Sequence, residues 1–278
     1  MAACAVCHRF PARKPHRHGA PGLIGAAAPK PRQRRISGRG AWRALAVQPL
    51  LVAAGVLAFV LWRLNASLNE TEARQLGWTA LWRSTREHLL LTVTAAGIVL
   101  VIAVPLGIAL TRRPLRRLSP VITGVANTGQ AAPAIGLFVL LATWLGFGFR
   151  TTVVALVVYA ALPVLRNTLV GIQGVDPRLV EAGRGMGMSA AAVLFRVELP
   201  LAVPVVLAGV RTALVLLVGT ATLATFIDGG GLGVLINTGI TLSLDSLLVS
   251  GAVLVALLAL AVDWLGRVVE HVARPKGL

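Results

Sequence analysis

Six apolar segments, each long enough to cross a lipid bilayer, limit what this chain can fold into. They cover roughly residues 44–64, 89–110, 120–146, 152–170, 202–226 and 247–266. Spanning the hydrocarbon takes about 20 helical residues at a rise of about 1.5 Å each. Only 13% of the 278 residues are charged, against about 25% in soluble domains. The sequence therefore predicts an all-α integral membrane protein with about six transmembrane helices.

The distribution of basic residues predicts the orientation in the membrane. With both termini in the cytoplasm, the cytoplasmic side holds 21 Lys and Arg and the outer side holds five. Basic residues concentrate on the cytoplasmic side of membrane proteins, so we expect a multi-pass protein of the cell (inner) membrane with cytoplasmic termini. The net charge of +17 does not indicate a nucleic-acid partner, because the basic residues fall between apolar runs rather than along one face.

This topology divides the chain into five parts. Residues 1–43 are rich in Arg, Pro and Gly without apolar periodicity, so we expect a disordered, basic cytoplasmic tail. The first transmembrane helix covers 44–64, an external segment covers 65–88, and a membrane core covers 89–270. A short cytoplasmic tail, 271–278, ends the chain.

Two short motifs suggest other chemistries. Cys4-Ala5-Val6-Cys7-His8 matches the C-x-x-C-H haem-attachment pattern, but the charge distribution keeps this segment in the cytoplasm, so a chance match in the tail is the favoured interpretation. A membrane-anchored c-type cytochrome stays as the enzyme-class alternative. The glycine-rich stretch 229–233 lacks the G-K-[ST] ending of a phosphate loop and is expected to form a tight turn on the outer side.

No arrangement of residues predicts catalysis. The chain has no Walker A sequence, no H-E-x-x-H and no G-x-S-x-G. We therefore expect a protein that is not an enzyme, has no catalytic residues, and itself binds neither a cofactor nor a metal.

A polar, glycine-containing stretch between the fourth and fifth apolar segments carries the most specific motif. It reads Glu181-Ala182-Gly183, then Gly187 after three residues, then Val197-Glu198-Leu199-Pro200 after nine more. This spacing resembles the EAA loop of ABC importer permeases, with Gly183 in place of Ala and Val197 in place of Ile. The resemblance implies a coupling loop over 176–200 that docks on an ATPase subunit. The implied ATPase-coupling residues are Glu181, Ala182, Gly183, Gly187, Leu199 and Pro200.

Between about residues 86 and 240 the chain is similar to the permeases of quaternary-amine (glycine betaine, carnitine, choline) importers. The similarity is carried by LPVLRNTLVGI at 162–172, DPRLVEAGRGMGMS at 176–189, VELPLAVPVVLAGVRTA at 197–213 and GTATLATFIDGGGLG at 219–233. It implies a type I importer (MetI-like) permease fold, two separate ATPase subunits that use ATP and Mg, a second permease subunit, identical or paralogous, and an external solute-binding protein. A permease for another small solute, such as an amino acid, remains the alternative.

Polar residues within the apolar segments are candidates for the solute path, because polar groups at membrane depth should face protein or water. Helix–helix hydrogen bonding is the alternative role, and a helix break near Pro133 could also act as a hinge. Arg211 is expected to be a structural residue with a partner rather than a solute contact. The candidate path residues are Asn127, Gln130, Pro133, Tyr159, Thr212, Thr220 and Thr222.

Overall fold

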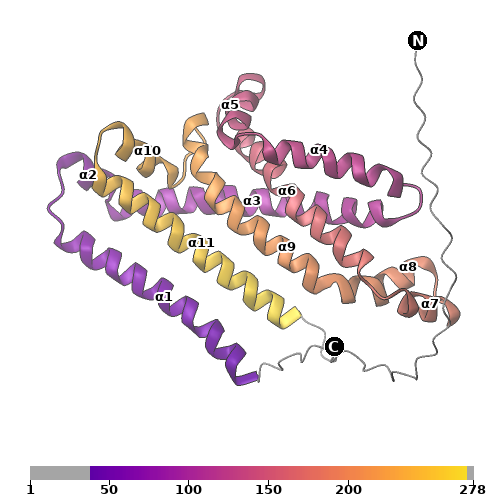
Figure 1. Cartoon of the computed structure of the whole chain (residues 1–278). Coiled ribbons are helices and arrows are strands. Elements are labelled where there is room, and N and C mark those ends of the chain that lie inside the picture. Colours follow the sequence, from indigo (N-terminus) through magenta and orange to yellow (C-terminus); the bar gives the residue numbers. More distant parts are fainter. Residues whose placement is uncertain (1–37, 274–278) are drawn as a thin grey trace, which may run out of the picture. The chain divides into compact units, whose positions relative to one another are not determined.

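The computed structural model describes residues 38–273, and all regular elements in this range are helical (Figure 1). Two stretches lie outside the described residues. Positions 1–37 hold most of the tail predicted over 1–43, including the Cys4-x-x-Cys7-His8 motif, and positions 274–278 end the chain.

Among the described residues, five helical stretches are long and apolar enough to span a membrane. They are α1 (Gly38–Asn65), α3 (Trp78–Thr111), α6 (Phe149–Gln173), the continuous run Ala190–Ile227 and α11 (Asp245–Ala273). The run contains α8 (Ala190–Val193), the π-helical turn η2 (Leu194–Glu198), α9 (Leu199–Thr220) and the 3₁₀ helix η3 (Ala221–Ile227). Shorter elements connect them: α2 (Glu70–Gln75), α7 (Pro177–Gly185) and α10 (Gly233–Thr241).

The predicted segment 120–146 is a pair of helices with a sharp bend between them. A 3₁₀ turn, η1 (Arg116–Leu118), leads into α4 (Ser119–Ala131), and α5 (Ala134–Leu145) follows after a bend of 99°. Ala132 has extended backbone angles and Pro133 begins α5. Proline disfavours helical geometry at the residue before it, so the break falls where the sequence predicts it. Counted as one span, α4 and α5 bring the total in the described chain to six.

Helix α3 begins earlier than the apolar pattern indicates. It runs unbroken from Trp78 to Thr111, so residues 78–88 of the expected external segment belong to the second span. Leu81 and His88 on these extra turns are buried, and Leu81 packs with Leu232 and Leu235 at the start of α10. Protein contacts rather than lipid therefore stabilise this extension, which is why hydropathy alone misses it.

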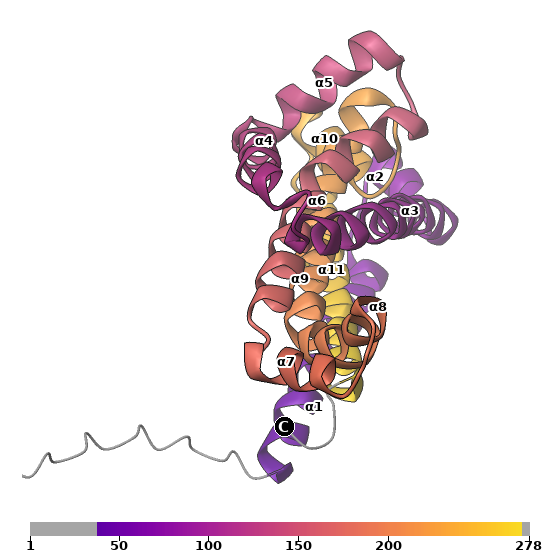
Figure 2. The same ribbon diagram turned by 90° about the vertical axis from the view of Figure 1, so that its right-hand side faces the viewer.

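The core of the molecule lies where α3, α6 and α9 pack together. Small residues allow the close approach: a Cβ on Gly107 of α3 would lie 2.7 Å from the Thr168 side chain, and one on Gly209 of α9 would overlap Asn167. Close packing at small residues is the usual mode of helix association in lipid. Figure 2 shows α7 and α8 together at one end of this helix packing and α5 and α10 at the other.

Helix α1 is peripheral and packs along α11 (Figure 1). The membrane-spanning part of α1 is almost entirely unburied, and its exposed side chains are large and apolar: Leu50, Leu51, Leu57, Leu61 and Leu64. Such a surface is stable in contact with lipid, in agreement with the predicted first transmembrane helix.

Candidate coupling site

The polar segment that follows α6 is a structured helix with its own start signal. Asp176 caps α7: its Oδ1 accepts a hydrogen bond of 2.9 Å from the Arg178 backbone N–H. Pro177 occupies the first turn, where its missing N–H costs nothing. The sequence therefore fixes the position at which α7 begins.

A tight turn after α7 reverses the chain into α8. Gly187 has a φ of +80°, a left-handed conformation that glycine adopts without strain. The Gly187 and Met188 N–H groups donate to the carbonyls of Arg184 (2.9 Å) and Gly183 (3.1 Å) and close the end of α7. Ser189 then caps α8 by accepting from the Ala192 N–H at 3.2 Å. Gly187 is thus required by backbone geometry.

Gly183 lies on the inner side of this helical hairpin. It is buried, and a Cβ added to it would lie 3.4 Å from Val193 and 3.7 Å from Val197, both ordinary van der Waals distances. The alanine that usually stands third in the EAA motif would fit here. The departure from the motif at Gly183 therefore leaves the hairpin packing intact.

The outer side of the hairpin is open. Glu181 and Ala182 are exposed, and three large apolar side chains lie on the same α7–α8–η2 segment with little cover: Leu179 (46% exposed), Met186 (71%) and Phe195 (65%). Because the Gly187 turn and the two caps hold the backbone, these side chains are presented on an ordered scaffold. This is an arrangement suited to a protein partner.

Leu199 and Pro200, at the end of the motif, join the hairpin to the membrane helix. Both are partly buried at the start of α9. A proline ring inside a regular helix clashes with the carbonyl four residues earlier. Here the turn before Pro200 is widened to a π turn, in which the Leu199 N–H donates to the Leu194 carbonyl. The chain therefore runs from α8 into α9 without a break, and movement of the hairpin would be passed to α9.

An ion pair that sequence reasoning missed ties this junction to α3. The Arg112 guanidinium contacts both carboxylate oxygens of Glu198, with Nη1 3.3 Å from Oε1 and Nη2 closer to Oε2. The Glu198 side chain is 7% exposed and that of Arg112 is 34% exposed. Glu198 fills the variable position of the Val-x-Leu-Pro pattern, so the motif itself gave no reason to select it.

The candidate path residues are divided between two regions. Asn127 is exposed and Gln130 is half-buried on α4, and Gly129 faces Val158 of α6 beside the half-buried Tyr159. Pro133 is exposed at the break before α5, and α5 packs against η3, which carries Thr222. The structure thus brings α4, α5, α6 and η3 into contact, whereas Thr212 is exposed farther along α9.

The three threonine hydroxyls bond to carbonyls three or four residues earlier in the same continuous helical run, Ala190–Ile227. Thr212 donates to Ala208 (3.0 Å), Thr220 to Leu216 (2.8 Å) and Thr222 to Gly219 (2.7 Å). These bonds satisfy the hydroxyls without a neighbouring helix, so the helix–helix alternative has no support at these three positions. Their role in a solute path stays a prediction.

Arg211 has partners, as expected for a structural residue, and both of them are carboxylates. Its Nε lies 2.8 Å from Asp263 and its Nη1 lies 3.4 Å from Glu270, both on α11. Asp263 also accepts from Arg267 and from the Gln48 amide of α1, each at 3.0 Å. This network joins α1, α9 and α11.

The glycine-rich stretch forms a turn that packs on α3. Gly230 and Gly231 have φ values of +75° and +88°, and the Gly231 N–H donates to Glu87 at 3.2 Å. This is a structural turn, as predicted. Within residues 38–273 no group of three or more His, Cys, Asp or Glu is placed to hold a metal ion.

Comparison with known proteins identifies the family. The model of the "Binding-protein-dependent transport system inner membrane component" family matches residues 103–274, more than half of the chain. The chain belongs to this family. The match runs from the last third of α3 through residues 176–200 to the end of α11, and leaves α1 and α2 outside.

Individual permeases of the family agree. The chain is 41% identical to the glycine betaine/carnitine/choline transport system permease protein OpuCB of Bacillus subtilis, over 70% of this chain and 88% of that protein. It is also 41% identical, with the same coverage, to the choline transport system permease protein OpuBB of Bacillus subtilis. It is 38% identical to the osmoprotectant import permease protein OsmW of Salmonella typhimurium, over 70% and 92% of the two chains.

The fold of the permease is also found in a solved transporter. A chain from inward facing conformations of the MetNI methionine ABC transporter superposes with a TM-score of 0.64 at 22% identity, covering 75% of this chain and 100% of that one. At this identity the likeness concerns the fold alone. It confirms the MetI-like type I importer fold that the sequence resemblance implies.

Proposed function

We propose that this chain is the permease subunit of an ATP-driven importer that moves a quaternary-amine osmoprotectant, such as glycine betaine, choline or carnitine, into the cell. The observation that carries the proposal is the identity of 36–41% to permeases named for these solutes. These relatives favour a quaternary amine over an amino acid as the solute, and a transport subunit over a cytochrome. ATP and Mg would be used by a separate ATPase.

The coupling hairpin, defined as residues 176–200, is the proposed contact with that ATPase. Its exposed face combines the Glu181 carboxylate with apolar side chains of Leu179, Met186 and Phe195, a mixture of apolar anchors and a polar rim that suits a protein interface. The unbroken helix from α8 into α9 and the Arg112–Glu198 ion pair give the hairpin two mechanical links to the membrane core. ATP-driven movement of the hairpin would reorient both α9 and α3.

Two substitutions test the hairpin as a coupling element. Glu181→Lys reverses a charge on the exposed face, and Gly187→Asp introduces a side chain at a positive φ. In proteoliposomes that contain the complete importer, both should lower solute uptake per ATP hydrolysed while the permease still inserts into the membrane. Wild-type coupling in both variants would refute the assignment.

Matched controls are available at the other end of the molecule. Glu70→Lys reverses an exposed charge on α2, whose ion pair with Arg74 is at the surface. Gly146→Asp also places a side chain at a positive φ, of +82°, with nothing within 4 Å of the new Cβ. Neither control should alter the coupling ratio. A loss of coupling in the controls as large as in the hairpin variants would show that the effect is not specific to the hairpin.

The remaining parts of the importer are proposed from the same family. Two ATPase subunits would bind the cytoplasmic side, a second permease would complete the path, and a solute-binding protein would deliver the amine from outside. Both chain termini would then be cytoplasmic. Labelling of single cysteines in intact cells tests this orientation: Glu70→Cys should react with an impermeant thiol reagent, and Gly185→Cys should react only after the membrane is opened. The opposite pattern would overturn the topology.

A further inference from the structure

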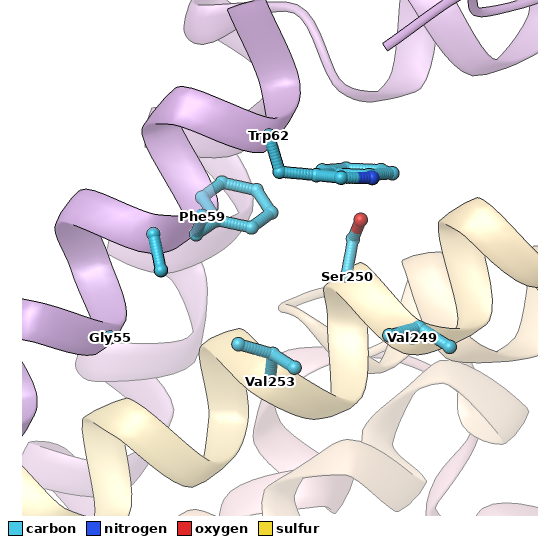
Figure 3. A pocket seen from close by; sticks show the side chains of 7 residues that line it. Gly55, Phe59, Trp62, Val249, Ser250 and Val253 are labelled. Atoms are coloured by element: carbon cyan, nitrogen blue, oxygen red, sulfur yellow. The ribbon is translucent and has the colours of Figure 1, made fainter. Parts of the chain in front are cut away.

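A pocket of about 320 Å³ opens between α1 and α11 (Figure 3). Its walls are Gly55, Ala58, Phe59 and Trp62 of α1 and Val249, Ser250 and Val253 of α11. None of these residues belongs to the packed core of α3, α6 and α9, and α1 presents large apolar side chains on its other faces as well.

Ser250 is the one polar side chain of the pocket that is fully enclosed. It is 2% exposed, and its hydroxyl has no hydrogen-bond partner among the described residues. The threonines on α9 donate to the carbonyl four residues earlier, whereas this hydroxyl does not. Figure 3 shows it turned into the pocket toward the Trp62 ring. A buried hydroxyl without a partner is costly, so an occupant that supplies a hydrogen-bond acceptor would stabilise this site.

A second, polar pocket of about 410 Å³ adjoins the first and shares Trp62 with it. It is lined by Asn65, Ser67, Glu72 and Ser246. The lining of the first pocket is almost entirely apolar, that of the second is largely polar, and Trp62 belongs to both. Tryptophan favours the headgroup layer of a bilayer, which places the polar pocket at that depth.

Glu72 gives the polar pocket its charge. Hydrogen bonds from the Ser246 hydroxyl and from the Asn69 N–H, at 2.9 Å in the latter case, lower the pKa of the Glu72 carboxyl. The side chain is therefore ionised at neutral pH. It is 9% exposed, and no ion pair joins it to a cation within residues 38–273. A buried carboxylate held only by neutral donors leaves the pocket favourable for a cation.

We propose that the two pockets form one binding site for a phospholipid with an ammonium headgroup. An acyl chain lies between α1 and α11, an ester carbonyl accepts from Ser250, and the ammonium contacts Glu72. Because Trp62 lines both pockets, one amphiphile could fill both, which favours it over a free ammonium solute that would leave the apolar pocket empty. The site rests on the membrane location of the chain and is independent of the transported solute.

The lipids that copurify with the complete importer test the site. From membranes that hold phosphatidylethanolamine and phosphatidylglycerol, the wild type should retain phosphatidylethanolamine in excess. Glu72→Gln should lower the ratio of the two retained lipids by about tenfold or more, the effect expected for loss of one charge-assisted hydrogen bond. Glu70→Gln, two residues away and exposed, is the matched control and should leave the ratio unchanged. Ser250→Leu should fill the apolar pocket and reduce both lipids.

A second measurement needs no variant. Spin-labelled phosphatidylethanolamine should associate with the wild-type importer more strongly than spin-labelled phosphatidylglycerol. Equal association, or a retained-lipid ratio that Glu72→Gln does not change, would overturn the proposal.

Displacement of the labelled lipid by free choline would assign the polar pocket to a soluble ammonium ion instead. A cross-link from Ala58→Cys to a second permease, formed in place of lipid binding, would assign the apolar pocket to a subunit contact.

Discussion

The two partners of the Arg112–Glu198 ion pair should differ in how much stability is lost when each is replaced. In Arg112→Gln the Glu198 carboxylate, with 7% of its side chain exposed, loses its counter-charge inside the protein. Breaking a buried pair in this way costs about 3 kcal/mol. In Glu198→Gln the remaining guanidinium, with 34% of its side chain exposed, can turn toward water, and the cost should fall to about 1 kcal/mol.

Thermal unfolding of the purified permease measures this difference. At about 2–4 °C per kcal/mol for a chain of this size, Arg112→Gln should lower the Tm by about 6–12 °C and Glu198→Gln by about 2–4 °C. The double variant removes the unpaired carboxylate as well, so it should be more stable than Arg112→Gln alone.

The order of the three variants is the decisive result. Equal losses in the two single variants, with the double variant showing their sum, would mean that the two side chains do not interact. A double variant less stable than Arg112→Gln would refute the argument from buried charge. If the pair also links α3 to the coupling hairpin, the double variant should regain stability without regaining wild-type coupling of ATP hydrolysis to uptake.

Three further changes have definite expected outcomes. Gly183→Ala should stabilise the permease by about 0.5–1 kcal/mol in thermal unfolding, because a Cβ there meets only ordinary contacts; a loss of stability would contradict the described packing. Gly209→Ala should destabilise it by about 1–3 kcal/mol, because the new Cβ overlaps Asn167, whereas Gly97→Ala, with nothing within 4 Å, should not. Because the pKa of Glu72 is lowered in the folded protein, its stabilising effect is present above the usual carboxyl value of 4.5 and is lost as the pH falls below it. Unfolding followed against pH should therefore show a steeper acid loss for the wild type than for Glu72→Gln, and parallel curves would contradict this.

Much of the fold can be predicted because lipid imposes a simple length rule. The apolar runs identify the six spans, and Pro133 identifies the break in the third, because proline acts on its immediate neighbour in the chain. The early start of α3 cannot be predicted in this way. Leu81 and His88 belong to a stretch too polar for the hydropathy pattern, and their burial depends on residues near 218 and 235.

In the candidate site, too, local features can be predicted and contacts between distant residues cannot. The Asp176 cap and the Gly187 turn can be predicted because each acts within a few residues. The Arg112–Glu198 pair joins positions 86 residues apart, and no local pattern specifies it. Ser250 reads as an ordinary small residue in an apolar helix. Its burial without a hydrogen-bond partner follows only from how α1 lies on α11.

The coupling motif combines two physical requirements that a sequence pattern does not separate. Gly183, Gly187 and Pro200 have roles within the hairpin itself: a buried position that accepts a small residue, a left-handed turn, and entry into a continuous helix. Glu181 and Ala182 are exposed, and the proposed contact with an ATPase would account for their place in the motif. Substitutions at the first group should therefore change the free energy of unfolding of the isolated permease. Substitutions at the second should change only the assembled importer, and this difference identifies which part of the motif the ATPase contacts.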